Sequence, residues 1–297
     1  MNQSEVERPL LISLFKVVIL TVPVWACFRL LIPIFAVTFP DAMGSQVSYT
    51  WAYDNFELMI IPYFISYTFT FSYIFTVIEK NLPGSKIQKG LLYGTVLGAI
   101  WYVGLIGVSI HYYAPLDFEA ISAFGDVIPI FIFGLLCGLF LGSDNIKEVE
   151  IQQKNSKWRI INFLSLFIFI FPGLVFRSLL GLVFTEPKSV AAMMLMIPFS
   201  ISQYIYTIVL FLTIGIFYYF IAPATPGDSI LKKNTYFSFG VFGVHWLFFQ
   251  GFFLIFYSGV FTYGISLTLI DSVAIFLSAN IYSRLIKNSR VSNYVWY

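Results

Sequence analysis

Long apolar stretches, separated by short polar segments, run through almost the whole chain. A helix of about 20 apolar residues is long enough to cross the hydrocarbon core of a bilayer. The strands of a membrane barrel would instead alternate apolar and polar positions over about ten residues. The pattern therefore predicts an all-α integral membrane protein. Eight spans are expected, over residues 10–37, 57–78, 88–111, 122–142, 160–184, 194–221, 235–258 and 263–284.

Composition supports this class. Hydrophobic residues make up 59% of the chain and charged residues only 11%, whereas about a quarter of a soluble domain is charged. The formal net charge of +2 is carried almost entirely by loops, and no long basic face predicts nucleic-acid binding. Both cysteines, Cys27 and Cys137, fall inside predicted spans, which favours small buried hydrophobes over a disulfide or a zinc site.

The loop charges predict an orientation. One set of loops carries nearly all of the lysine and arginine, whereas the opposite set carries only Lys188 among several acidic residues. By the positive-inside rule, both termini are expected in the cytoplasm of a multi-pass cell-membrane protein. An odd number of spans would mix the two sets. The residues on the basic side are Arg8, Lys80, Lys86, Lys89, Lys147, Lys154, Lys157, Arg159, Lys232, Lys233, Arg284, Lys287 and Arg290.

The two halves of the chain resemble each other at four places in the same order. These matches predict two parallel four-helix repeats, residues 1–145 and 160–297, joined by a polar cytoplasmic linker, residues 146–159. Because four is even, both repeats enter from the same side, and a cleft is expected between them. The matches are LPGSKIQKG (82–90) with TPGDSILKK (225–233), GAIW (98–101) with GVHW (243–246), ISAFGDVIPIF (121–131) with ISLTLIDSVAIF (265–276), and CFRLL (27–31) with VFRSLL (175–180).

Four charged residues lie inside predicted spans at matching places in the two halves. Arg29 corresponds to Arg177, and Asp126 corresponds to Asp271. Counting ~1.5 Å per residue places all four at one level, roughly 20–31 Å from the cytoplasmic edge. An isolated charge in lipid is costly, so each arginine is expected to pair with an aspartate. The sequence leaves open whether the pairs form within a repeat or between repeats.

Two interpretations of these charges follow. They are salt bridges that lock the helices together, or they line an outward-open polar cavity in which the arginines bind an anionic group. His245 and Gln250 lie in the seventh span, about one turn apart. His245 is a hydrogen-bonded core residue or a proton relay. The candidate solute-binding residues are Arg29, Asp126, Arg177, His245, Gln250 and Asp271.

The chain contains no P-loop, H-E-x-x-H or G-x-S-x-G motif. No catalytic residue, cofactor or metal is therefore expected. The leading expectation is a transporter or solute-binding membrane protein for a small anionic or amphipathic solute, held between the repeats in a lipid bilayer. The alternatives are a non-transporting scaffold or accessory subunit with a partner chain, and a membrane-embedded enzyme that acts on lipid. In the Pro-Gly loops, Ser85 and Asp228 are expected to cap the helices that follow.

Overall fold

The structure is a computed structural model, and it describes residues 3–38, 56–112, 116–144, 166–183, 201–256 and 261–288. These residues form helices and short turns, with no strand among them. The chain divides into two compact units. Unit 1 comprises residues 1–109 and 113–147, and unit 2 comprises residues 110–112 and 148–297. The predicted linker, residues 146–159, lies outside the described residues.

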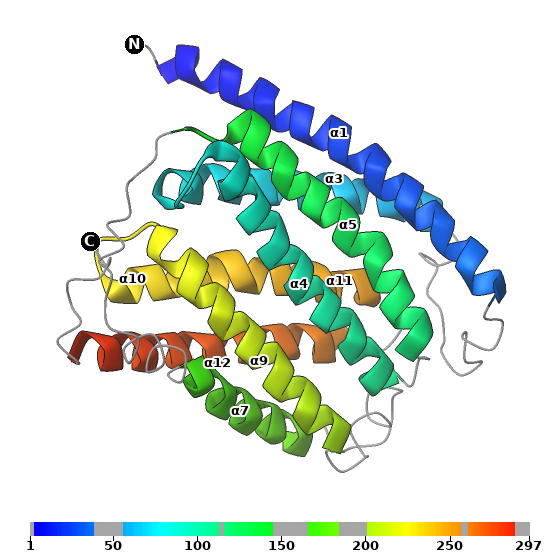
Figure 1. Ribbon diagram of the computed structural model, residues 1–297. Coiled ribbons are helices and arrows are strands. Elements are labelled where there is room, and N and C mark those ends of the chain that lie inside the picture. The colour runs from blue at the N-terminus through cyan, green and yellow to red at the C-terminus, as the bar shows by residue number, and fades with distance from the viewer. Residues whose placement is uncertain are drawn as a thin grey trace. The chain divides into compact units, whose positions relative to one another are not determined.

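Unit 1 is built on the first helix. Helix α1 (Gln3–Thr38) lies along α5 (Leu116–Leu141) and also packs on α3 (Phe56–Ile78). Figure 1 shows α1 and α5 side by side over much of their length. A single turn of 3-10 helix, η2 (Glu79–Asn81), follows α3 and leads to α4 (Lys86–Tyr112).

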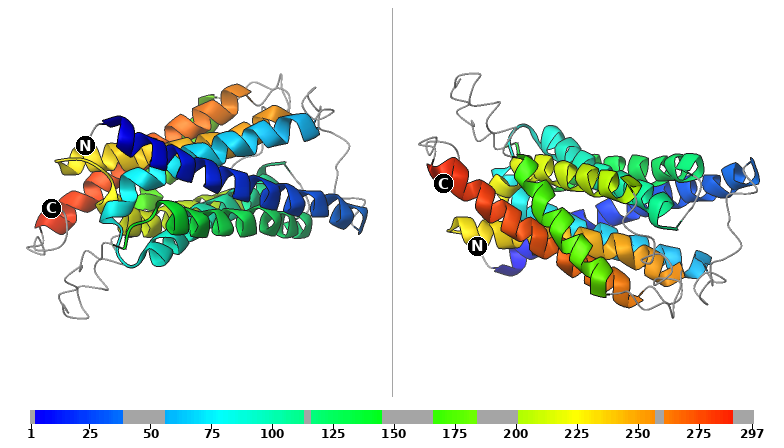
Figure 2. Two further views of the ribbon diagram at one scale, coloured as in Figure 1. Left: turned by 90° about the horizontal axis from the view of Figure 1, so that it is seen from above. Right: turned by 90° about the horizontal axis from the view of Figure 1, so that it is seen from below.

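Unit 2 is built on the last helix. Helix α12 (Phe261–Asn288) contacts α7 (Ile170–Val183), the 3-10 turn η3 (Leu166–Phe169) and α11 (Val244–Phe256). Figure 2 shows α7 running along α12. The remaining elements are α9 (Ile201–Ile221), η4 (Ala222–Ala224), α10 (Ile230–Thr235) and the π-helix η5 (Tyr236–Gly243).

Helices occur at all eight predicted spans. Six of the described helices are long and apolar enough to cross a membrane, and they contain the segments Leu10–Arg29, Met59–Asn81, Lys86–Gly107, Ala123–Leu141, Gln203–Ala224 and Gly264–Leu285. The fifth predicted span holds a shorter apolar helix, Leu166–Leu180. In the seventh, α10, η5 and α11 follow one another without interruption from Ile230 to Phe256. Of the predicted spans, residues 160–165, 184, 194–200 and 257–258 lie outside the described residues.

Lipid explains why these sequences fold as helices. A helix satisfies its backbone hydrogen bonds internally, which is required where no water is available. Pro62 and Pro129 lie within α3 and α5, as membrane helices tolerate. Large apolar side chains remain on the outer surfaces, including Ile19, Phe171 and Leu269, each more than half exposed. This surface suits a bilayer and not water.

The two Pro-Gly loops have the same construction. In each, a 3-10 turn follows the second long helix, and its first carbonyl accepts a hydrogen bond, from Leu82 N to Glu79 O and from Thr225 N to Ala222 O. A glycine with positive φ comes next, Gly84 at 94° and Gly227 at 145°. Such a backbone strains any residue with a side chain.

A serine then caps the next helix in both loops. The Ser85 hydroxyl accepts from Gln88 N, while Gln88 Oε1 accepts from Ser85 N, which together form a capping box. In the second loop the cap is Ser229, which accepts from Lys232 N. The prediction that Asp228 caps this helix is wrong. Asp228 instead forms an ion pair with Lys232, one turn away on the exposed surface.

The π-helix η5 coincides with a change in the spacing between the two halves. Ser229 lies 144 residues after Ser85, whereas Trp246 lies 145 residues after Trp101. The distance along the chain between these two points is therefore one residue longer in unit 2 than in unit 1. A π segment is the way in which an α-helix absorbs one additional residue without breaking.

Candidate functional site: two buried arginine–aspartate pairs

In unit 1, Arg29 of α1 forms a two-point ion pair with Asp126 of α5. The guanidinium donates through Nε to Asp126 Oδ1 at 2.6 Å and through Nη2 to Asp126 Oδ2. The Asp126 side chain is fully buried, and that of Arg29 is 11% exposed. Paired hydrogen bonds between a guanidinium and a carboxylate are strong and geometrically specific.

Two tryptophans complete the surroundings of Asp126. Trp25 Nε1 donates to Oδ1 at 2.8 Å, and Trp101 Nε1 donates to Oδ2 at 3.0 Å. Asp126 therefore accepts four hydrogen bonds. The two indoles are in contact with each other and with Tyr67, and Trp25 also stacks on Phe64. The pair is held in a dense aromatic core.

In unit 2, Arg177 of α7 pairs with Asp271 of α12 in the same manner. Nε donates to Oδ1 at 2.9 Å, and Nη2 donates to Oδ2 at 2.7 Å. The side chains are 4% and 0% exposed. The predicted pairing of arginine with aspartate is thus confirmed. Each pair lies within its own unit, so the arginines do not pair across the two halves of the chain.

The surroundings of the second pair differ. Arg177 lies over the rings of Tyr206 and Phe211, 5.3 and 5.6 Å from their centroids, which stabilises the cation without a tryptophan. Gly173, four residues before Arg177, occupies the place that Trp25 has before Arg29. A Cβ at Gly173 would lie 2.4 Å from the Phe211 ring, so this ring fills the corresponding space.

The second tryptophan is present in unit 2 and makes different contacts. Trp246 corresponds to Trp101 in the GVHW and GAIW segments. It stacks against Phe242 and Phe249. Its Nε1 atom is buried and has no hydrogen-bond partner among the residues that the structure describes. The hydrogen bonds found for Asp271 within this part of the chain both come from Arg177.

Unit 2 has the more polar interior. Of the twenty buried polar or charged residues in the described part of the chain, fourteen belong to unit 2. At corresponding positions of α3, α4 and α5, unit 1 has apolar side chains. The polar residues of unit 2 are Gln203, Thr207, His245, Gln250, Thr268 and Ser272, and their counterparts are Ile60, Phe64, Ile100, Leu105, Ala123 and Val127.

The difference in polarity runs the other way at one position, because Thr68 of unit 1 corresponds to the aromatic Phe211 of unit 2. The two remaining predicted site residues lie in α11: His245 is fully buried, and Gln250 is 8% exposed. Buried polar groups inside a membrane protein are costly and commonly mark a binding site or an ion path. The interior of unit 2 therefore has the character of such a site.

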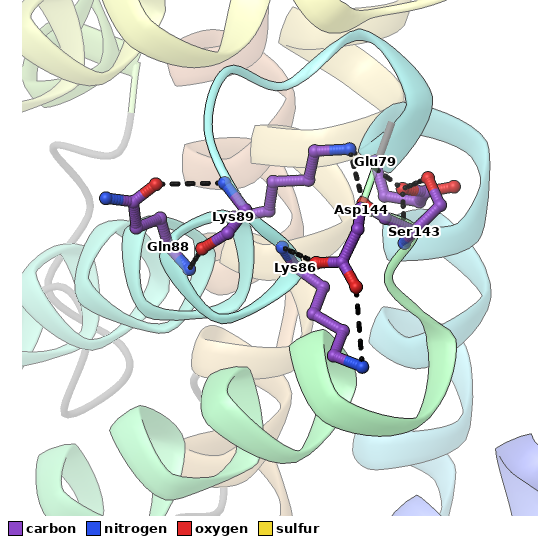
Figure 3. Close-up of polar contacts among 7 residues, drawn as sticks. Glu79, Lys86, Gln88, Lys89, Ser143 and Asp144 are labelled. Atoms are coloured by element: carbon purple, nitrogen blue, oxygen red, sulfur yellow. Dashed lines mark hydrogen bonds and ion pairs between the residues drawn. The ribbon is translucent and has the colours of Figure 1, made fainter. Parts of the chain in front are cut away.

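A second buried ion pair, which the sequence did not reveal, closes one end of unit 1 (Figure 3). Lys89 of α4 donates to Glu79 Oε2 at 3.3 Å and to the Ser143 carbonyl at 3.0 Å. The same carboxylate oxygen accepts from the backbone and the hydroxyl of Ser143. These bonds tie the residues after α5 to the turn η2. The i+10 spacing of Glu79 and Lys89 across a Pro-Gly turn was the signal available in the sequence.

Among the described residues, no group of three or more His, Cys, Asp or Glu side chains could hold a metal ion. The fold and its buried charges define a polytopic helical membrane protein. Comparison with known proteins adds no narrower class: no protein-family model matches the chain, and neither curated proteins nor solved structures give a match.

Proposed function

We propose that this protein is a transporter or solute-binding membrane protein for a small anionic or amphipathic solute, and that the interior of unit 2 holds the solute. The observation that carries this proposal is the unequal polarity of the two interiors around equivalent arginine–aspartate pairs. If both pairs were only structural, there would be no reason to keep a costly polar interior around one of them.

Each unit then has its own role. In unit 1, four hydrogen bonds satisfy Asp126, and tightly packed aromatic rings surround the pair, so that it acts as a lock between α1 and α5. In unit 2, the anionic group of the solute displaces the Asp271 carboxylate and binds the Arg177 guanidinium in its place. The rings of Tyr206 and Phe211 beside Arg177 suit an apolar portion of the same solute. His245 and Gln250 supply further polar contacts.

We propose in addition that the units are copies of one four-helix ancestor, oriented alike with both termini in the cytoplasm. The support is the repeated construction of the Pro-Gly loops and of the two ion pairs. The runner-up function is a non-transporting scaffold or accessory subunit. The observation in its favour is that both arginines are already paired with carboxylates.

A matched pair of variants tests the proposal. Arg177→Gln/Asp271→Asn and Arg29→Gln/Asp126→Asn each remove both charges of one pair, which avoids leaving a buried charge alone. Thermal stability of the purified protein would be measured with a panel of small carboxylates, phosphates and fatty acids. We expect a stabilising ligand for the wild type, the same shift for the Arg29/Asp126 variant and no shift for the Arg177/Asp271 variant.

Two outcomes would contradict the proposal. If no compound stabilises the wild-type protein, the scaffold function leads. If a compound stabilises both double variants equally, a solute binds, but Arg177 does not hold it. A tightly bound ligand at 100 times its Kd should stabilise the folded state by about 2.7 kcal/mol, which a thermal shift detects easily.

A further inference from the structure

In unit 1, the backbones of α4 and α5 are in close contact along the surface where the two helices meet, which we call the seam. A Cβ atom built on Gly90 of α4 would lie 2.4 Å from the Gly134 carbonyl oxygen, and one on Gly134 would lie 2.4 Å from the Gly94 Cα. A Cβ on Gly138 would meet the Lys86 carbonyl oxygen at 2.4 Å. Backbones this close leave no room for water between the helices.

The corresponding seam of unit 2 lies between α12 and the run formed by α10, η5 and α11, and it carries polar side chains. Ala279 and Ser283 of α12 take the places of Gly134 and Gly138. Tyr218 OH donates to Asn234 Oδ1 at 2.6 Å and lies 2.7 Å from Ser283 Oγ. Asn234 Nδ2 also reaches Asn280 Oδ1 at 3.2 Å. A buried hydrogen-bonded network therefore occupies one end of this seam.

Three buried polar atoms in the elements that form this seam have no partner among the described residues. They are Ser238 Oγ in η5, Tyr282 OH in α12 and Trp246 Nε1 in α11, and each side chain is at most 1% exposed. In the described part of unit 1, Thr21 Oγ1 is the one such atom. The ring of Tyr282 faces α9 and η3, where it lies against Tyr218 of the hydrogen-bonded network and Phe169. Buried donors and acceptors without protein partners are the usual ligands of internal water.

The backbone of the seam is irregular around Ser238. Ser238 lies inside the π-helix, four residues after Asn234. Gly243, at the end of the π-helix, faces Ser272, with its Cβ position 2.9 Å from Ser272 Oγ. Ser272 follows Asp271 directly. Polar groups thus recur along the seam from the Asn234 network to the aspartate, and π segments are frequent at functional sites.

We infer that the seam between α12 and the α10–η5–α11 run is a hydrated path that gives Asp271 access to protons from the end at which Asn234 lies. Ser283 is 12 residues beyond Asp271, so the path is about 18 Å long. The inference deepens the proposed function and rests on it for its purpose. When an anionic group takes Arg177, the Asp271 carboxylate loses its partner and accepts one proton to become a carboxylic acid, which keeps the site neutral.

Charged and titratable side chains lie on several of the elements that pack on α12. Arg177 on α7 binds the Asp271 carboxylate directly. The elements that pack on α12 also carry Tyr204, Tyr206, Tyr218 and Tyr219 on α9, Lys232 and Lys233 on α10, Tyr236 on η5, and His245 on α11. Asp271 is the acidic group among the described residues of these elements and α12, so a proton entering the seam has one carboxylate to reach.

Hydroxyl-radical labelling by X-ray radiolysis of water tests the path without any solute, because radicals formed from internal water label the side chains beside it. The probes are Trp246 and Tyr282, and the matched controls are the equally buried Trp101 and Tyr93 of unit 1. We expect several-fold faster labelling of the unit 2 residues in the intact protein. Equal, slow labelling of all four would overturn the path.

Two variants sharpen the result. Ser238→Val removes an unpartnered hydroxyl and adds methyl groups to the seam. It should slow the labelling of Trp246, which lies beyond Ser238, and leave Tyr282, at the entry end, unchanged. Ser278→Ala removes a buried hydroxyl that already donates to the Ala274 carbonyl, and it should leave labelling unchanged. If the Val variant labels like wild type, water does not pass Ser238 and the path is wrong. The wild-type comparison stands even if a variant misfolds, and its result is independent of whether a solute is found.

Discussion

At the scale of single residues, burial decides what each ion pair contributes. Glu79 and Lys89 are almost completely buried, and three of the bonds around them involve Ser143. The Lys232–Asp228 pair is mostly exposed. The hydrogen bond from Lys232 lowers the pKa of Asp228, so the Asp228 carboxylate stays charged at neutral pH. The chain thus offers a buried pair and an exposed pair for comparison.

Lys89→Met is expected to lower the free energy of unfolding by about 3–5 kcal/mol, because it leaves the Glu79 carboxylate buried without its cation. Lys232→Met removes the partner of the exposed Asp228 and should change the free energy of unfolding very little, because water screens this pair. Unfolding in mixed detergent, followed by tryptophan fluorescence, measures both. The double variant Glu79→Gln/Lys89→Met should recover much of the loss. Similar losses for Lys89→Met and Lys232→Met would show that burial does not set the strength of these pairs.

The sequence predicts the charged residues better than their neighbours. A pairing of arginine with aspartate could be predicted from sequence because a lone charge in lipid is costly and all four charges lie at equal depth, but the sequence did not say which aspartate Arg177 binds. The indole donors of Asp126 could not, since an apolar sequence does not distinguish a tryptophan that packs from one that donates a hydrogen bond. The match of Trp101 with Trp246 was visible, but their different contacts depend on the packing of Phe242 and Phe249.

At the scale of helices, glycine has two distinct roles. Gly134 lies where α4 and α5 meet, with backbone atoms of Gly90 and Gly94 within 2.6 Å of its Cβ position. Around Gly251 of α11, no other side chain or neighbouring element in the described part of the chain comes within 4 Å of its Cβ position. The first allows close helix packing, whereas the second only weakens its helix.

Gly134→Ala should therefore destabilise the protein by about 1–3 kcal/mol, since α4 and α5 must move apart. Gly251→Ala should be neutral or stabilise it by up to about 1 kcal/mol through better helix propensity. Thermal unfolding of the two variants in the same detergent compares them directly. Equal effects would mean that the α4–α5 contact contributes little to stability.

Helix positions followed from the pattern of apolar residues, but their irregularities did not. The predicted segment 235–258 corresponds to a helix that contains the π segment η5. The one-residue change in spacing between the halves was present in the sequence. Spacing alone does not say whether the additional residue lengthens a loop or forms a π segment in a helix. In both cases Trp246 would occupy the position that corresponds to Trp101. The choice of Ser229 over Asp228 as helix cap was equally undecided, since both residues make good caps.

At the scale of the whole molecule, the distribution of basic residues predicts the orientation in the membrane. With Cys27 and Cys137 replaced by alanine, a single cysteine would be introduced by Lys154→Cys or by Lys188→Cys. A membrane-impermeant maleimide applied to intact cells should label the cysteine at position 188. It should label the one at position 154 only after permeabilisation, because that loop is predicted to be cytoplasmic. The reverse labelling pattern would show that the orientation is opposite to the predicted one. Labelling of both cysteines on intact cells would show that both positions face outward, which contradicts the prediction of an even number of spans.

The pairing of charges within each unit also has a consequence for biosynthesis. Arg29 is made 97 residues before Asp126, and Arg177 is made 94 residues before Asp271. At about 5–20 residues per second, each arginine waits roughly 5–20 s for its carboxylate. An unpaired arginine costs about 2.5–3.5 kcal/mol at the centre of a membrane helix, and this cost is an upper bound for arginines in the outer part of the bilayer. We therefore expect the helix that carries each arginine to stay close to the translocon until the helix that carries its aspartate has been made.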